Sequence, residues 1–113
     1  MNRPHRLGDA ALAQALSDNP HWSSHGAAPA TMIVREVVLP SFPAAIAFVT
    51  EVGFAAEALN HHPDIFIRWC TVRLTLSTHD AGGLTALDFQ LAKMIDAIVS
   101  ASRVASPVSG VAP

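Results

Sequence analysis

Three of the six histidines of this chain are concentrated in one stretch of its sequence. His61 and His62 are adjacent and stand directly before Pro63, and His79 follows a run of alternating apolar and polar residues. An imidazole ring changes charge near neutral pH, so it can give or take a proton during a reaction. The pattern predicts a site of general acid–base catalysis, with His61, His62 and His79 as its candidate catalytic residues.

The residues alone leave two other roles open for these histidines. His61 and His62 could simply close a helix, because a positively charged ring is favourable near a helix C-terminus. The third histidine favours a site instead. Three histidines could also bind zinc, but adjacent residues in extended backbone point in opposite directions, so this pair is poorly placed to share an ion. Metal binding is therefore the minor alternative.

Composition limits the remaining function classes. A length of 113 residues suits one domain, which we expect to span residues 1–102. Residues 104–113 are small and include Gly and Pro, which predicts a disordered tail at 103–113. A net charge of -2 and scattered Arg and Lys residues argue against direct nucleic-acid binding. Cys70, the only cysteine, cannot form an intrachain disulfide and is expected to be buried and inert.

The balance of apolar and charged residues predicts how the domain meets its surroundings. With 50% hydrophobic and 14% charged residues, the domain is expected to cover some apolar surface by forming a homo-oligomer. No apolar run approaches the ~18 residues of a spanning helix, so we expect no membrane association. A cytoplasmic location is the default expectation.

Periodicity and turn residues predict the elements that must position the histidines. Helical spacing of apolar residues indicates three helices, and β-branched or alternating residues indicate four strands. The expected order is a helix at 9–17, strands at 21–25 and 31–39, a helix from 42 to about 60, strands at 65–69 and 71–77, and a helix from 86 to about 102. This order, α-β-β-α-β-β-α, predicts a single α+β domain whose antiparallel four-stranded sheet packs helices on one face and leaves the other wetter.

Capping and breaking residues predict where these elements end. Suitable helix N-caps are Asp9, Ser41 and Thr85. Thr85 and Asp88 also have the spacing of a capping box. Because a residue before proline is pushed out of the helical region, Pro63 ends the long helix near Asn60 or His61. The histidine pair is therefore expected at a corner between that helix and a strand.

The apolar face changes parity between the last two predicted strands. Ile65 and Ile67 fall on odd positions, and Val72 and Leu74 fall on even ones. A constant buried face therefore requires a turn or bulge near Cys70 and Thr71. The two tryptophans, Trp22 and Trp69, are expected to be packing residues.

Several segments together carry a resemblance to a known family. They are Ala56–Pro63, Leu74–Asp80, Gly83–Thr85 with Asp88, Trp22 and the helix beginning at Phe42. In combination they resemble the pterin-4a-carbinolamine dehydratase family over most of the chain. The resemblance implies a hydro-lyase, 4a-hydroxytetrahydrobiopterin dehydratase, which removes water from 4a-hydroxytetrahydropterin to give quinonoid dihydropterin without a metal or redox cofactor. It further implies a dimer or tetramer that is functionally coupled to an aromatic amino-acid hydroxylase, the source of the carbinolamine.

The resemblance also assigns site residues. The family's active-site histidines correspond to His61, His62 and His79, and Glu57, Asn60 and Asp88 would line or support the pterin pocket. Two positions differ from animal members of the family, because position 60 is Asn rather than Asp and position 87 is Leu rather than Arg. From the residues alone, Glu57 could instead be an exposed surface charge and Asp88 only a helix cap.

A second function class follows from the same resemblance. Animal members of the family also stabilise dimers of a transcription factor, and some relatives that lost catalytic histidines act in assembly of a carbon-fixing enzyme. An interaction or assembly module is therefore the alternative to an enzyme. Because this chain keeps all three histidines, the enzyme is the favoured interpretation.

Overall fold

The computed structural model of the chain describes residues 4–28 and 30–102. Its elements are α1 (Asp9–Asp18), β1 (Ser23–His25), β2 (Met32–Val38), α2 (Phe42–Leu59), β3 (Asp64–Arg68), β4 (Thr71–Leu76), the 3-10 helix η1 (His79–Ala81) and α3 (Ala86–Ala101). The strands form one sheet in the order β1-β2-β4-β3, and every neighbouring pair is antiparallel. The predicted α+β domain, with the order α-β-β-α-β-β-α, is confirmed. The tail expected at 103–113 lies outside the described residues.

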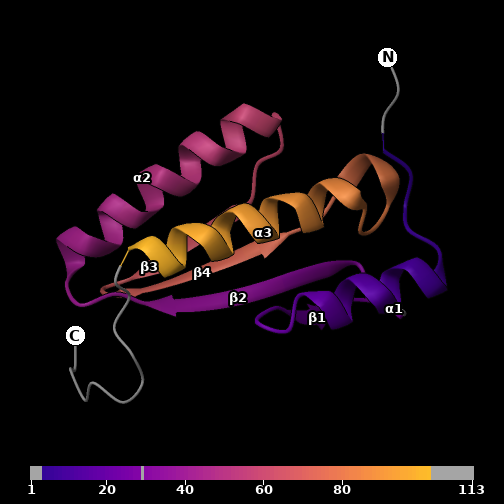
Figure 1. The fold of residues 1–113 in the computed structure, drawn as a ribbon, viewed down its shortest axis with the longest axis horizontal. Helices are drawn as coiled ribbons and strands as arrows, with labels where there is room; N and C mark the ends of the chain where they lie inside the picture. Colours follow the sequence, from indigo (N-terminus) through magenta and orange to yellow (C-terminus); the bar gives the residue numbers. More distant parts are fainter. Residues whose placement is uncertain (1–3, 29, 103–113) are drawn as a thin grey trace.

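The hydrophobic core lies between the helices and one face of the sheet. Alternate residues of β2 and β4 are fully or almost fully buried, among them Ile33, Val37, Val72, Leu74 and Leu76. They belong to one cluster with buried residues of α1, α2 and α3. Helices α2 and α3 lie side by side across the sheet (Figure 1). The packing follows from period-2 burial on the strands and an apolar stripe on each helix.

The opposite face of the sheet carries exposed and polar side chains. Glu36 of β2, Arg73 of β4 and Phe66 of β3 are aligned across three strands, and all three are exposed. The guanidinium of Arg73 lies 4.9 Å from the centre of the Phe66 ring. This face is the wetter face that the alternation of residues 71–77 predicts.

Local capping chemistry ends α2 directly before the histidine pair. Asn60 adopts the left-handed conformation with φ 49°, which Asn tolerates better than most residues. The N–H of Asn60 donates to the carbonyl of Glu57 and the N–H of His61 donates to that of Ala56, both at 3.0 Å. These two bonds form a Schellman motif. The histidine pair therefore stands at the predicted corner between α2 and β3.

Two of the three predicted helix N-cap residues are confirmed. Ser41 caps α2 by accepting from the N–H of Ala44 at 3.1 Å. Thr85 and Asp88 form a complete capping box at α3. The prediction for α1 is wrong, because its N-cap is Gly8, Asp9 is its first residue, and no side chain caps it.

A two-residue turn, Trp69-Cys70, joins β3 to β4 and accounts for the parity change. Arg68 pairs with Thr71 across this turn, so odd positions of β3 share a face with even positions of β4. Cys70 is buried, as expected. The packing role expected for Trp69 is wrong, since its side chain is 61% exposed, whereas Trp22 is buried as predicted. Trp69 also has φ 56°, a strained conformation for a bulky residue.

Helix α2 contradicts the expectation that no apolar run reaches membrane-spanning length. It has 18 residues, and by length and composition it could cross a membrane. Core helices of soluble proteins can have the same length and apolar composition. In this fold Ala45, Phe48 and Val52 of α2 are buried in the core, while Phe42, Ile46 and Phe54 are exposed.

One polar cluster connects the start of the sheet to α3. Asp96 Oδ1 accepts from Trp22 Nε1 at 2.9 Å and forms an ion pair with Arg35 Nη1. Arg35 shares the buried face of β2 with Ile33 and Val37, and its side chain is only 14% exposed. The cluster therefore places a cation at the edge of the core, with Asp96 as its ion-pair partner among the described residues.

We expect Asp96→Ala to lower the free energy of unfolding by about 2–3 kcal/mol, because it leaves a mostly buried guanidinium and an indole N–H without their acceptor. Urea denaturation followed by circular dichroism measures the change. Asp18→Ala is the matched control, since within residues 4–28 and 30–102 the side chain of Asp18 accepts only an exposed hydrogen bond, from Gln14. That control should change stability by less than about 0.5 kcal/mol. Equal effects of the two substitutions would contradict the structural role of Asp96.

Candidate active site

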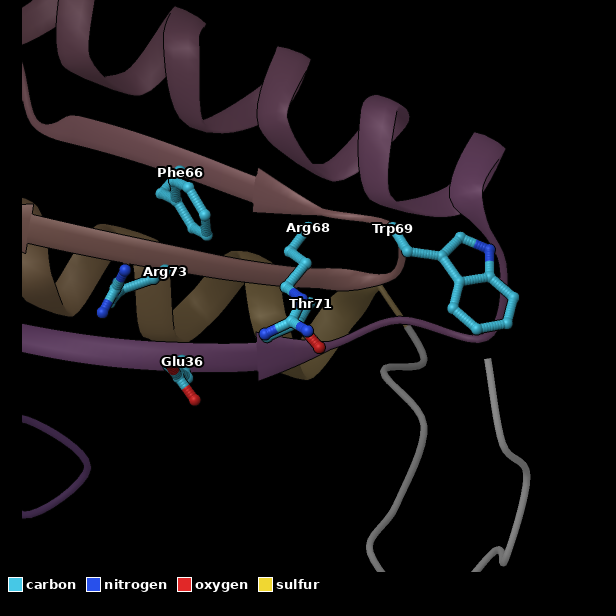
Figure 2. A pocket seen from close by; sticks show the side chains of 6 residues that line it. All are labelled: Glu36, Phe66, Arg68, Trp69, Thr71 and Arg73. Carbon is cyan, nitrogen blue, oxygen red and sulfur yellow. The ribbon is translucent and has the colours of Figure 1, made fainter.

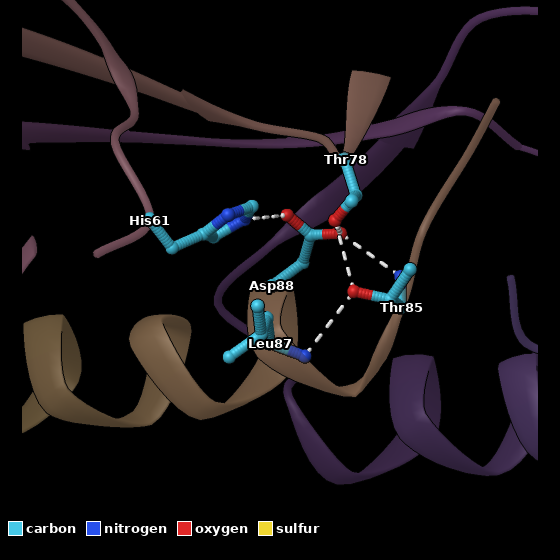
Figure 3. Close-up of polar contacts among 5 residues, drawn as sticks. All are labelled: His61, Thr78, Thr85, Leu87 and Asp88. Carbon is cyan, nitrogen blue, oxygen red and sulfur yellow. Dashed lines mark hydrogen bonds and ion pairs between the residues drawn. The ribbon is translucent and has the colours of Figure 1, made fainter. Parts of the chain in front are cut away.

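The least exposed histidine of the predicted site is His61, which pairs with a buried carboxylate. Its Nε2 lies 2.6 Å from Asp88 Oδ1. The side chain of His61 is 11% exposed, and that of Asp88 is fully buried. The pair joins the corner after α2 to the first turn of α3 (Figure 3). Two residues that the sequence singled out for separate reasons thus form one unit.

Two threonines hold the second oxygen of Asp88. Oδ2 accepts from the backbone N–H of Thr85 at 2.9 Å and from the hydroxyl of Thr78 at 2.7 Å. The hydroxyls of Thr78 and Thr85 are 2.9 Å apart, and Thr85 Oγ1 accepts from the N–H of Leu87 at 3.3 Å. Figure 3 shows the Asp88 carboxylate between His61 on one side and the two threonines on the other. Asp88 therefore caps α3 with one oxygen and contacts His61 with the other.

His62 points to a different partner from its neighbour. Its Nε2 lies 2.8 Å from Glu57 Oε1 of α2. The side chains of His62 and Glu57 are 59% and 77% exposed. Their bond lies at the surface, where pairs of this kind contribute little to stability. The divergence of the two rings agrees with the alternation expected for neighbours in extended backbone.

His79 is the first residue of η1 and is exposed. The 3-10 helix is closed by bonds from the N–H of Ala81 to the carbonyl of Thr78 and from that of Gly82 to the carbonyl of His79, both at 3.0 Å. Gly82 follows with φ 70°, a conformation that favours glycine. The sequence pattern ends the strand at residue 77 and does not predict a helical turn here.

A cavity of about 150 Å³ lies beside His61. It is lined by Pro4, Asn60, His61, Thr78, Asp80 and Leu87. His79 stands between two of these residues in the chain, but neither His79 nor His62 lines the cavity. The two positions that differ from animal relatives, Asn60 and Leu87, both do.

The N-terminal segment supplies one wall of this cavity. The N–H of Leu7 donates to the carbonyl of Leu84 at 2.9 Å, which fixes the segment against the loop between η1 and α3. Arg6 lies so close to Gly83 that a Cβ on that glycine would be 2.7 Å from its Cδ. These contacts bring Pro4 to the cavity. The sequence pattern gave no signal for Pro4, whereas Thr78 and Asp80 lie within the motif that carries the family resemblance.

A larger hollow, of about 390 Å³, lies on the uncovered face of the sheet. Its lining residues are Glu36, Phe66, Arg68, Trp69, Thr71 and Arg73. Figure 2 shows Phe66 and Arg73 over the strands and Trp69 at the end of the hairpin. None of the three histidines lines this hollow, so it is separate from the candidate active site.

The side chains of the site can move protons but are not grouped as metal ligands. Within residues 4–28 and 30–102, no three His, Cys, Asp or Glu side chains lie close enough to hold a metal ion. His61 and His62 each pair with a different carboxylate. The geometry therefore offers an imidazole at a small cavity, supported from behind by a buried carboxylate.

Most of the chain is similar to known proteins. Residues 5–98 match the family described as pterin 4 alpha carbinolamine dehydratase. A protein of Chloroflexus aurantiacus is 55% identical over 94 residues, which are 83% of this chain and 97% of the relative. A protein of Nocardia farcinica is 54% identical over 90 residues, which are 80% and 90% of the two chains. Both relatives carry the name pterin-4-alpha-carbinolamine dehydratase as a provisional assignment.

Two solved structures resemble the fold. A transcriptional coactivator/pterin dehydratase from Brucella melitensis has a TM-score of 0.76 and 30% identity, covering 84% of this chain and 99% of that one. A pterin dehydratase-like protein that is a RuBisCO assembly factor in the alpha-carboxysome has a TM-score of 0.58 and 23% identity, covering 69% and 88%. The second likeness supports the fold alone.

Proposed function

Because the chain belongs to the pterin-4a-carbinolamine dehydratase family, we propose that it is a 4a-hydroxytetrahydrobiopterin dehydratase that recycles pterin downstream of an aromatic amino-acid hydroxylase. The single observation that supports this most directly is the His61–Asp88 pair beside a cavity. A buried carboxylate behind an imidazole orients the ring and stabilises its charged form, which favours general acid–base catalysis.

The proposed reaction is an elimination of water. The C4a–O bond breaks, and the leaving hydroxide takes a proton from an acid to become water. The proton on N5 passes to a base, and its electron pair forms the C4a–N5 double bond of quinonoid dihydropterin. The reaction consumes no net proton and needs no redox cofactor. His61 and His79 are the proposed acid–base residues, and His62 the residue that holds the pterin, with Glu57 and Asn60 beside it.

The direct test is the rate of dehydration of synthetic 4a-carbinolamine, followed by absorbance and compared with the spontaneous rate. General acid–base catalysis contributes about 10²–10⁴-fold, which is sufficient for a compound that already dehydrates unaided. We expect saturable acceleration that is proportional to the concentration of the chain. A folded chain that leaves the spontaneous rate unchanged would exclude the dehydratase function.

We expect activity to survive treatment with EDTA. The proposed steps are proton transfers between the pterin and imidazole rings, and no step uses a metal. Dialysis against EDTA followed by the dehydration assay measures the effect, with and without added zinc. Loss of activity that zinc restores would replace the proposed mechanism with a metal-dependent one.

An interaction role is the second candidate function, and the uncovered face of the sheet favours it. The hollow there holds Arg68 and Arg73, which form no ion pair within the described part of the chain. The exposed, strained Trp69 stands at its end. Arg and Trp are enriched among the residues that dominate protein interfaces. An acidic protein surface would complement this face, and the solved structure at 30% identity is named a transcriptional coactivator as well as a pterin dehydratase.

The two functions can be separated because their surfaces are separate. A chain with Arg68→Ala and Arg73→Ala should dehydrate the carbinolamine at the unaltered rate, since neither arginine lines the cavity beside His61. If the assembly role is the main one, the unaltered chain will show no acceleration in the same assay. Loss of dehydration in the double arginine variant would contradict the separation of the two surfaces.

We also propose that the chain forms a homo-oligomer. Phe42, Ile46 and Phe54 are exposed on α2, with Phe54 73% accessible. Their spacing of four or eight residues places them along one side of the helix, and exposed apolar stripes of this kind mark association surfaces. Light scattering at micromolar concentration should give a multiple of 11.9 kDa. A species of 11.9 kDa alone would contradict the proposal.

A further inference from the structure

We propose that Asp88 is a positioning residue that sets the ring tautomer of His61, so that Nε2 carries the proton and Nδ1 is left as the proton acceptor at the cavity. The consequence for catalysis rests on the dehydratase function proposed above. Asp88 itself is fully buried and does not line the cavity, so it cannot hold the pterin directly. Its influence must pass through the groups that it contacts.

The direction of the bonds to Oδ2 of Asp88 follows from the donors. The backbone N–H of Thr85, at 2.9 Å, can only donate. The hydroxyl of Thr78, at 2.7 Å, has one proton, and it is used toward the same oxygen. In the contact between the two hydroxyls, Thr85 is therefore the donor and Thr78 the acceptor. Thr85 Oγ1 in turn accepts from the N–H of Leu87.

These bonds make a directed chain that runs from Leu87 through Thr85 and Thr78 to Asp88. Every proton in it points toward the carboxylate, which suits a group that only accepts hydrogen bonds when ionised. The first oxygen of the carboxylate, Oδ1, then needs a donor from His61 at 2.6 Å. The only ring atom of His61 in that position is Nε2, so Nε2 carries the proton.

The other ring nitrogen of His61 is free for chemistry. Nδ1 forms no hydrogen bond with the described residues, and it is not among their buried unpartnered polar atoms. Because His61 lines the cavity and its Nε2 contacts Asp88, Nδ1 is the ring nitrogen left for a ligand there. In the neutral ring a nitrogen without a proton is an acceptor. The proton that leaves N5 of the pterin would form the Nδ1–H bond, and the charge of the resulting imidazolium is stabilised by Asp88.

Asp88→Asn tests this assignment, because the chain of donors dictates how the amide must lie. The fixed N–H of Thr85 requires an oxygen at the position of Oδ2, so the amide NH₂ must face His61. The NH₂ group can only donate a hydrogen bond, so Nε2 of His61 must accept it. The proton of the neutral ring is thereby moved to Nδ1, where it blocks the acceptor at the cavity. The capping bond to Thr85 remains, so α3 should keep its N-terminus.

The measurement is ¹⁵N nuclear magnetic resonance of the His61 ring, at a pH where the ring is neutral. We expect the Nε2–H tautomer in the unaltered chain and the Nδ1–H tautomer in Asp88→Asn, with a fall in kcat of roughly 10²-fold or more and a small change in KM. Asp18→Asn, a change of the same chemistry on the surface of α1, should leave both tautomer and rate unchanged. Far-ultraviolet circular dichroism confirms folding.

Two outcomes would overturn the assignment: the Nδ1–H tautomer in the unaltered chain, or an unchanged tautomer in a folded Asp88→Asn variant. The first needs no variant, so the test holds even if Asp88→Asn does not fold. The resonance measurement also needs no substrate. An unaltered chain that has the expected tautomer but does not accelerate dehydration would contradict the dehydratase function and leave the role of Asp88 intact.

Discussion

Replacing His61 by Ala should lower kcat for carbinolamine dehydration on the order of 10²-fold or more, with a much smaller change in KM. His61 is the one histidine of the three that lines the cavity, and its ring is held from behind by Asp88. Its loss removes a proton acceptor that acts in the transition state, whereas the cavity walls remain to bind the pterin. Steady-state kinetics on synthetic carbinolamine measure both constants.

Alanine variants of the other histidines should change the kinetic constants in different ways. His79→Ala should also lower kcat, and the double change with His61→Ala should cost far more than either alone. His62→Ala should mainly raise KM. His21→Ala is the matched control, because His21 is exposed outside every helix and strand and lies apart from the candidate site. Near-normal turnover in a folded double variant would eliminate the acid–base assignment.

The boundaries of the elements around the site could be predicted because they depend on residues that are neighbours in sequence. Asn60 accepts the left-handed conformation, and Pro63 prevents the helix from continuing. Thr85 and Asp88 are three residues apart, so their capping bonds form within one turn. The parity change at Cys70 required a turn, and a turn is present.

The pairing of His61 with Asp88 could not be predicted from the residues alone. It joins positions 27 residues apart, and their approach depends on how α3 packs beside α2. Capping fully accounts for an aspartate at position 88, which conceals any second role. The structure separates the two roles by atom, because Oδ2 caps the helix and Oδ1 contacts His61. A carboxylate has two acceptor oxygens, so one explanation did not exclude the other.

Exposure was also hard to infer from residue type. Large aromatic residues usually supply buried area, and Trp22 does so at 5% exposure. Trp69 has the same side chain but occupies the hairpin turn between β3 and β4, where it is 61% exposed. Its position in the turn, rather than its hydrophobicity, decides its exposure.

The contribution of Pro4 to the cavity wall could not be predicted from its residue type either. It depends on the hydrogen bond between Leu7 and Leu84, which are far apart in the sequence.

The largest expected change in stability comes from Asp88→Ala. Removing a fully buried carboxylate leaves three donors without an acceptor: His61 Nε2, the Thr78 hydroxyl and the Thr85 N–H. Each buried unpaired group costs about 1–3 kcal/mol, and loss of one member of a buried pair costs about 3–5 kcal/mol. We expect a loss of about 3–5 kcal/mol in the free energy of unfolding, a large share of the 5–15 kcal/mol typical of a domain.

Urea denaturation measures this loss, and Asp88→Asn is the control that separates shape from charge. The amide keeps an acceptor for Thr85 and Thr78 and fills the same volume, so its cost should be about 1–2 kcal/mol. Asp88→Ala should therefore unfold at a clearly lower urea concentration than Asp88→Asn. If both unfold at the same concentration as the unaltered chain, the carboxylate is not holding α3, His61 and Thr78 together. The hydrogen-bond chain would then have no energetic basis.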